Sequence, residues 1–212
     1  QRDKTANLVT FTSLKNHLGH VLILLSSGRH FYKKSIERIE SKRQPMHLKN
    51  TAPHLAQLHL PHASLSGLIF MAVERNTLGH CFNDKQRFNY YPASPFPTIS
   101  WIFEGQLHMV QNGDATRPQL DPSLPNIIFA GPHDQPSASW SPSSVHALTV
   151  SFYPEKLSQL FDISMTSYMN QVCPLEAVAP DSWLMIARNL INSVRNGACH
   201  NPFQHLQDNL LY

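Results

Sequence analysis

The hydrophobic pattern in the middle of the chain has a period of two, which is typical of β-strands. Apolar and polar side chains alternate in Val145–Tyr153, so His146 and Phe152 fall on one face. Thr98–Glu104 alternates in the same way, and we expect Leu107–Val110 to return beside it as a partner strand. The other expected strands are Gly67–Val73, Leu124–Ala130 and Ala138–Ser141. Short strands between Pro and Gly breaks favour a β-barrel or sandwich.

After Pro154 the pattern changes to that of amphipathic helices. Pro154 suits the first position of a helix, and Leu157 and Phe161 lie on one side of it. A longer helix is expected over Asp181–Asn196, and a last one over Asn201–Tyr212. Strands followed by helices predict an α+β fold, in which a β-barrel or sandwich precedes a C-terminal helical segment.

Charge divides the chain into a basic start and an acidic remainder. Residues 1–49 carry ten Lys and Arg against three Asp and Glu, a net charge of +7. The remainder has seven against eleven, a net charge of −4, which argues against nucleic-acid binding by this part. We therefore expect a basic extension at 1–49, a β-rich domain at 50–153 and a helical segment at 154–212.

Cysteine usage and apolar run lengths predict a cytoplasmic protein. Cys81, Cys173 and Cys199 are odd in number and widely spaced, which indicates neither a disulfide framework nor a zinc knuckle. Near the N-terminus the longest apolar run is Val21–Leu25, much shorter than the ~20 residues that span a bilayer. No membrane partner is expected.

Motifs for covalent chemistry are missing from the sequence. There is no nucleophile elbow, phosphate loop or dinucleotide fingerprint. Thirteen histidines raise the question of a metal, but His54, His59 and His62 have a spacing that fits neither one helix face nor one strand face. The sequence therefore predicts no catalytic residues, no metal, no cofactor and no enzymatic activity.

Two groups of apolar side chains remain as candidates for function. If the strands close into a barrel, one group fills it or lines a ligand cavity. Its members are Trp101, Phe103, Phe129, Trp140, His146 and Phe152. The second group lies on the expected C-terminal helices and is a candidate dimerisation surface, although such helices also cap the barrel of a monomer. Its members are Trp183, Ile186, Leu190, Phe203, Leu206 and Leu210.

An ordered series of short blocks resembles the N-terminal sensory domain of AraC-type transcriptional regulators. The blocks are Tyr91-Pro92-Ala93, Pro95-Phe96-Pro97, Ile99-Ser100-Trp101, Glu104-Gly105, Pro125–Pro132, Trp140-Ser141-Pro142, Val145–Pro154 and Cys173-Pro174-Leu175-Glu176. They extend over roughly Tyr90 to Leu211. The resemblance implies a cupin-like β-barrel, helices that mediate dimerisation, and a DNA-binding domain of two helix-turn-helix units. Those units are expected after Tyr212, and we expect this chain to stop at the domain boundary.

The resemblance predicts the regulatory domain of a bacterial transcription factor, which senses a small ligand, forms a homodimer, or does both. DNA would be bound only through the helix-turn-helix domain. Three alternatives stay open: a cupin-type metal-dependent enzyme that uses the abundant histidines, an interaction domain without a ligand, and direct DNA binding by the basic residues 1–49. The pattern expected of the enzyme, HxH followed shortly by Glu, does not occur. The sequence does not identify the effector, the target genes or the role of residues 1–49.

Overall fold

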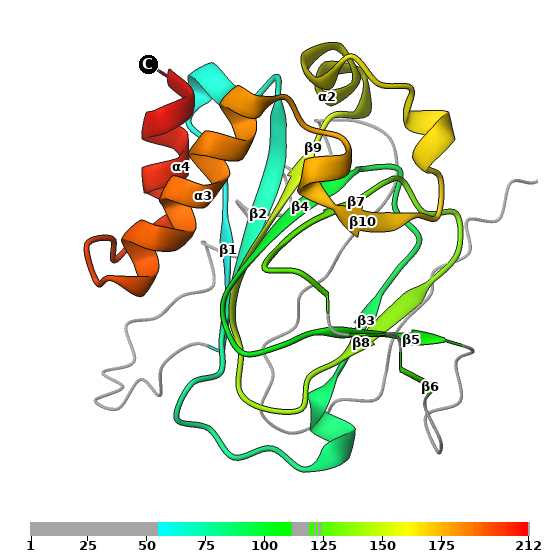
Figure 1. Ribbon diagram of the computed structural model, residues 1–212, viewed down its shortest axis with the longest axis vertical. Coiled ribbons are helices and arrows are strands. Elements are labelled where there is room, and N and C mark those ends of the chain that lie inside the picture. Colours follow the sequence, from blue (N-terminus) through cyan, green and yellow to red (C-terminus); the bar gives the residue numbers. More distant parts are fainter. Residues whose placement is uncertain (1–54, 112–118, 121, 123, 212) are drawn as a thin grey trace, which may run out of the picture. The chain divides into compact units, whose positions relative to one another are not determined.

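Two antiparallel β-sheets and a set of C-terminal helices make up the structure (Figure 1). It is a computed structural model that describes residues 55–111, 119–120, 122 and 124–211. The predicted basic extension at 1–49 lies outside the described residues. The α+β prediction is confirmed, since strands fill the first part of the described chain and helices dominate the last.

The larger sheet has six strands in the order β1-β2-β9-β4-β7-β10. Its strands are β1 (Ala56–His59), β2 (Ile69–Asn76), β4 (Thr98–Glu104), β7 (Ile127–Ala130), β9 (His146–Phe152) and β10 (Val172–Pro174). In the register of β9, Ala147 lies opposite Arg75 of β2, and Thr149 lies opposite Ser100 of β4. Because β10 follows α2 in the chain, the larger sheet extends beyond the predicted boundary at Tyr153.

The smaller sheet has four strands in the order β3-β8-β5-β6. They are β3 (Phe88–Tyr91), β8 (Ser137–Trp140), β5 (His108–Gln111) and β6 (Gln119–Leu120). The predicted pairing of Thr98–Glu104 with the next strand was wrong, because β4 pairs with β7 and β9 while β5 pairs with β8 and β6. Gly105, with φ of 87°, turns the chain out of one sheet and into the other.

Three α-helices follow β9 in the described part of the chain, with β10 between the first and the second. They are α2 (Pro154–Phe161), α3 (Asp181–Arg195) and α4 (Pro202–Leu211). Single 3₁₀ turns occur at Ala63–Leu65, Asp84–Arg87, Met165–Tyr168 and Leu175–Ala177. Pro154 and Pro202 each occupy the first position of a helix, where a missing N–H costs nothing. None of the helices in the described ranges combines the length and the apolar character that a membrane crossing requires.

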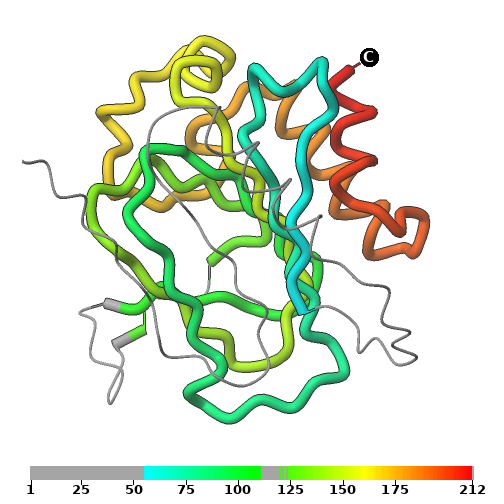
Figure 2. Tube along the Cα trace, turned by 180° about the vertical axis from the view of Figure 1, so that it is seen from behind, coloured from blue at the N-terminus to red at the C-terminus, as the bar shows by residue number. Residues whose placement is uncertain are grey.

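The two faces of the larger sheet have different surroundings. The face with Leu148 and Val150 is covered by α2, α3 and α4 and forms the main core with them; we call it the helix-side face. Figure 2 shows β1 beside α4, where the His59 and Phe203 rings lie 5.5 Å apart. The opposite face carries Ile102 and Ala147, which belong to a smaller core, and we call it the inner face.

Candidate functional site

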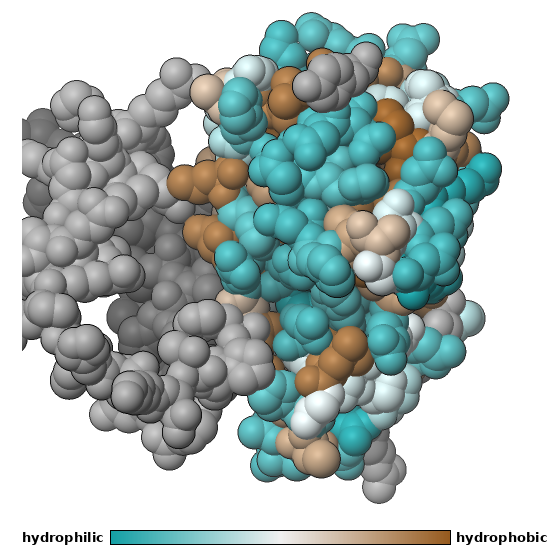
Figure 3. All heavy atoms as spheres, turned by 90° about the vertical axis from the view of Figure 1, so that its left-hand side faces the viewer, coloured by the Kyte–Doolittle hydropathy of each residue, from teal (hydrophilic) through white to brown (hydrophobic). Residues whose placement is uncertain are grey.

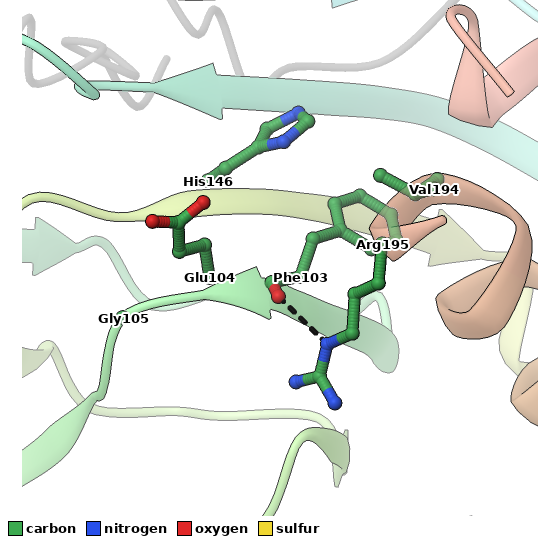
Figure 4. A pocket seen from close by; sticks show the side chains of 6 residues that line it. All are labelled: Phe103, Glu104, Gly105, His146, Val194 and Arg195. Atoms are coloured by element: carbon green, nitrogen blue, oxygen red, sulfur yellow. Dashed lines mark hydrogen bonds between the residues drawn. The ribbon is translucent and has the colours of Figure 1, made fainter. Parts of the chain in front are cut away.

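A pocket of about 430 Å³ opens where the larger sheet meets the end of α3. Figure 4 shows the residues that line it: Phe103, Glu104, Gly105, His146, Val194 and Arg195. Phe103 and Glu104 end β4, and Gly105 follows them. His146 begins β9, and the last two residues close α3. A Cβ atom at Gly105 would collide with the carbonyl oxygen of Ser144, so this rim of the pocket requires glycine.

Arg195 joins α3 to the sheet. Its Nε donates a hydrogen bond to the carbonyl oxygen of Phe103 at 2.8 Å, drawn in Figure 4, and Nη2 donates to that of Ile102 at 3.3 Å. A cation in the last turn of a helix also interacts favourably with the helix dipole. The guanidinium therefore fixes the end of the helix to the end of β4, at the wall of the pocket.

Behind the pocket, one carboxylate is held between two imidazoles. Oε1 of Glu74 lies 2.9 Å from Nε2 of His146, and Oε2 lies 3.3 Å from Nε2 of His59. All three side chains are largely buried on the helix-side face. The hydrogen bond with His146 lowers the pKa of Glu74 and outweighs burial, which acts in the opposite direction. Glu74 is therefore ionised at neutral pH, and its hydrogen bond fixes the orientation of the His146 ring.

The pocket combines ionisable and apolar groups. His146 lies against Phe103 with ring centroids 4.9 Å apart, while Glu104 is exposed at the rim. Such a set can bind a small polar molecule and can move a proton through the imidazole. In the described part of the chain, no group of three His, Cys, Asp or Glu side chains is placed to hold a metal ion.

The inner face carries hydroxyl groups and a guanidinium. Ser100 and Thr149 share a hydrogen bond there, with their hydroxyl oxygens 2.9 Å apart. From the smaller sheet, the Tyr91 hydroxyl lies 2.9 Å from that of Ser139. Arg75 lies on the same inner face, opposite Ala147 in the register. Sequence reasoning missed this polar group, although the polar positions between the aromatic ones in residues 98–104 were its signal.

The structure separates the six predicted ligand-binding residues. Phe103 and His146 meet in the pocket, whereas Trp140 lies on the smaller sheet beside His108. Trp101, Phe129 and Phe152 are completely buried on the helix-side face. The prediction that these aromatic side chains fill or line the interior of a barrel is corrected for these three, because they point toward the helices and form the core there.

The six predicted dimerisation residues also face the protein's own core. Trp183, Leu190, Phe203 and Leu206 are buried against the sheet. Ile186 and Leu210 are partly buried in the same cluster. Figure 3 shows that the described surface on this side is mostly hydrophilic, with scattered apolar residues. The apolar stripes therefore attach the helices to the sheet and do not form an exposed partner surface.

Comparison with known proteins finds similar solved structures at low sequence identity. No protein-family model and no curated protein matches the sequence. Among solved structures, Fe(II)-HppE is 18% identical with a TM-score of 0.32, over 50% of this chain and 54% of that one. The ethanolamine utilization protein EutQ of Salmonella typhimurium is 17% identical with a TM-score of 0.29, over 50% and 75%. Oxalate decarboxylase of Bacillus subtilis is 9% identical with a TM-score of 0.22, over 59% and 42%.

The two antiparallel sheets and the C-terminal helices fit the predicted α+β fold, a cupin-like β-sandwich. The chain spans about half the length of HppE. The prediction that the chain is not an enzyme is corrected, because structures with this fold include an oxalate decarboxylase. Side chains from separate strands meet in this fold, as Glu74 and His146 do, 72 residues apart.

Proposed function

We propose that the chain is the sensory domain of a bacterial AraC-type transcriptional regulator. In this proposal a small effector occupies the pocket beside α3, and the C-terminal helices transmit its presence to a DNA-binding segment. The observation that supports the proposal is the placement of the pocket. An occupant contacts the sheet through Phe103 and His146, and contacts α3 through Val194 and Arg195.

The coupling requires only that the effector favours one arrangement of α3 over another. The effector would change this arrangement through Arg195, because the hydrogen bonds of Arg195 to Phe103 and Ile102 set the distance between α3 and β4. An effector that competes for the guanidinium would release the end of the helix. One that packs between His146 and Val194 would hold the helix in place.

The cellular setting and the partners are part of the same proposal. Cys81, Cys173 and Cys199 are unpaired thiols, which suits the reducing cytoplasm. Homodimerisation follows from the resemblance to AraC-type regulators, and sedimentation analysis of the purified chain tests it. DNA binding is assigned to helix-turn-helix units encoded after Tyr212. Two such units in the coding sequence there support the regulator proposal, and an unrelated domain contradicts it.

A pocket-filling variant tests effector binding directly. In a thermal-shift screen of metabolites, we expect at least one compound to stabilise the wild-type chain by mass action. At a ligand concentration one hundred times Kd, the free energy of unfolding rises by about 2.7 kcal/mol. Val194→Phe fills the pocket and should abolish this shift. Met185→Phe makes a comparable change on the exposed side of the same helix and should preserve it. Equal shifts in both variants, or no stabilising compound, would contradict the proposal.

An enzymatic function is the second candidate, and one observation favours it. His146, oriented by the ionised Glu74, lines the pocket together with Glu104, an arrangement suited to general acid–base catalysis. This candidate is supported if the wild-type chain turns over a compound that binds in the pocket, and if His146→Gln still binds that compound but no longer turns it over. Elemental analysis of the purified chain tests the metal-dependent form of this function, which predicts stoichiometric metal.

A further inference from the structure

The pocket beside α3 carries two charged side chains of opposite sign that do not pair with each other. Glu104 ends β4 and Arg195 ends α3, and both line the pocket (Figure 4). Both residues are exposed to solvent. Among the residues that the structure describes, no ion pair involves either of them. An anionic group and a cationic group are therefore both available to an occupant of this pocket.

The backbone of β4 sets the positions of these two charges. Arg195 is hydrogen-bonded to the carbonyl oxygens of Phe103 at 2.8 Å and Ile102 at 3.3 Å, and Glu104 is the next residue along the strand. Because Nη1 of the guanidinium takes part in neither bond, Arg195 keeps N–H donors for a ligand. The carboxylate of Glu104 lies beyond ion-pair distance of the guanidinium. A ligand that reaches both groups must therefore carry its own two charges some distance apart.

The other residues that line the pocket favour an aliphatic segment between those charges. Phe103 and Val194 are apolar, and Gly105 has no side chain. Nε2 of His146 is already bonded to Glu74 at 2.9 Å. Apolar atoms of a ligand gain free energy when such surroundings remove them from water.

We propose, on the basis of the effector pocket proposed above, that this pocket selects an ω-amino acid. The carboxylate of the ligand binds Arg195, its ammonium group binds Glu104, and its methylene chain lies against Phe103 and Val194. Both polar contacts are charge-assisted hydrogen bonds. A molecule with a single charge leaves one of the two protein groups without a partner, and a dicarboxylate is repelled by Glu104. The difference between these cases is the source of specificity.

Compounds with the same number of carbon atoms and different charges test the proposal. We compare 4-aminobutanoate with butanoate and butylamine, and 5-aminopentanoate with pentanoate and pentylamine, by NMR titration of the full chain. At least one amino acid should bind about fivefold more tightly than both of its singly charged partners, a modest factor because the two protein charges are exposed. Val194→Phe, which fills the pocket, should abolish this binding.

Substitutions of Glu104 test the ammonium end of the pocket without disturbing the attachment of α3. Glu104→Gln should remove the preference for the amino acid over the acid. Glu104→Lys should reverse the charge preference, so that glutarate binds this variant more tightly than 4-aminobutanoate does. Glu176→Gln removes an exposed carboxylate from outside the pocket and should leave the preference unchanged.

The proposal is overturned if no amino acid binds more tightly than its singly charged partners. It is equally overturned if Glu104→Gln retains the same preference as Glu176→Gln. In either case the effector pocket itself stands if Val194→Phe abolishes the binding of another metabolite from the thermal-shift screen. If no compound binds in a way that Val194→Phe abolishes, the effector pocket and the ω-amino acid are both excluded.

Discussion

The two faces of the larger sheet use alternate residues of the same strands for opposite purposes. In β9, Leu148, Val150 and Phe152 face the helices and are completely buried, whereas Thr149 faces inward and is bonded to Ser100. In β2, Glu74 faces the helices and its neighbour Arg75 faces inward. The helix-side face thus supplies most of the apolar burial, and the inner face carries polar groups that a purely structural core does not need.

The largest expected effect comes from the helix-side face. Phe152→Ala removes a fully buried ring that packs on Trp183, with ring centroids 6.0 Å apart. The loss of burial and the cavity left behind should cost about 3–5 kcal/mol in urea unfolding. Leu160→Ala on α2 is the control, because Leu160 is 42% exposed and should cost much less. Similar costs for the two variants would contradict the assignment of this face as the main core.

The second-largest effect on stability should come from the contact of Glu74 with His146 and His59, on the same face. Glu74→Gln removes the carboxylate that accepts a hydrogen bond from His146 and lies 3.3 Å from Nε2 of His59, and should cost about 1–3 kcal/mol at neutral pH. Because folding lowers the pKa of Glu74, its contribution is present above the pKa of an unfolded glutamate and is lost as the pH falls through the folded pKa.

Urea unfolding between neutral and acidic pH measures this contribution. The difference between wild type and Glu74→Gln should shrink toward acid, since protonation of the wild type removes the same charge. Glu104→Gln, at the exposed rim of the pocket, should change stability by less than about 0.5 kcal/mol. A Glu74 difference that stays constant with pH would refute the role given to the ion pairs.

A smaller effect is expected where α3 is joined to the sheet. Arg195→Ala removes the hydrogen bonds to Phe103 and Ile102 and should cost about 1 kcal/mol. Hydrogen exchange should quicken in the last turn of α3. Arg188→Ala breaks an exposed ion pair with Glu176 at 3.7 Å and should cost at most about 0.5 kcal/mol. If both variants exchange equally at the helix end, Arg195 does not join the helix to the sheet.

The sequence predicted the regular elements well where the pattern was long. Expected strands over Thr98–Glu104 and Val145–Tyr153 and an expected helix over Asp181–Asn196 correspond to β4, β9 and α3. By contrast, β1 was missed, because it has four residues, lies at a sheet edge, and leaves Leu58 45% exposed. The α+β order therefore followed from sequence alone, while the edges of the sheets did not.

The candidate site was harder to predict, for a physical reason. Alternation places His146 with Leu148 and Phe152, but it does not show which face of a sheet meets helices when both faces are covered. The aromatic residues of β4 and β9 were therefore assigned to the interior of a barrel, and they lie under the helices. The pairing of Glu74 with His59 and His146 depends on sheet register, which no local spacing reveals.

The smallest effect on stability should come from the hydroxyl pair on the inner face, in contrast to the large effect expected on the helix-side face. The double substitution Ser100→Ala with Thr149→Val removes both partners of one hydrogen bond at similar shape. Such an exchange is nearly neutral, so unfolding should change by less than about 0.5 kcal/mol. A large loss of stability would mean that these hydroxyls serve the fold, as the aromatic residues of the opposite face do.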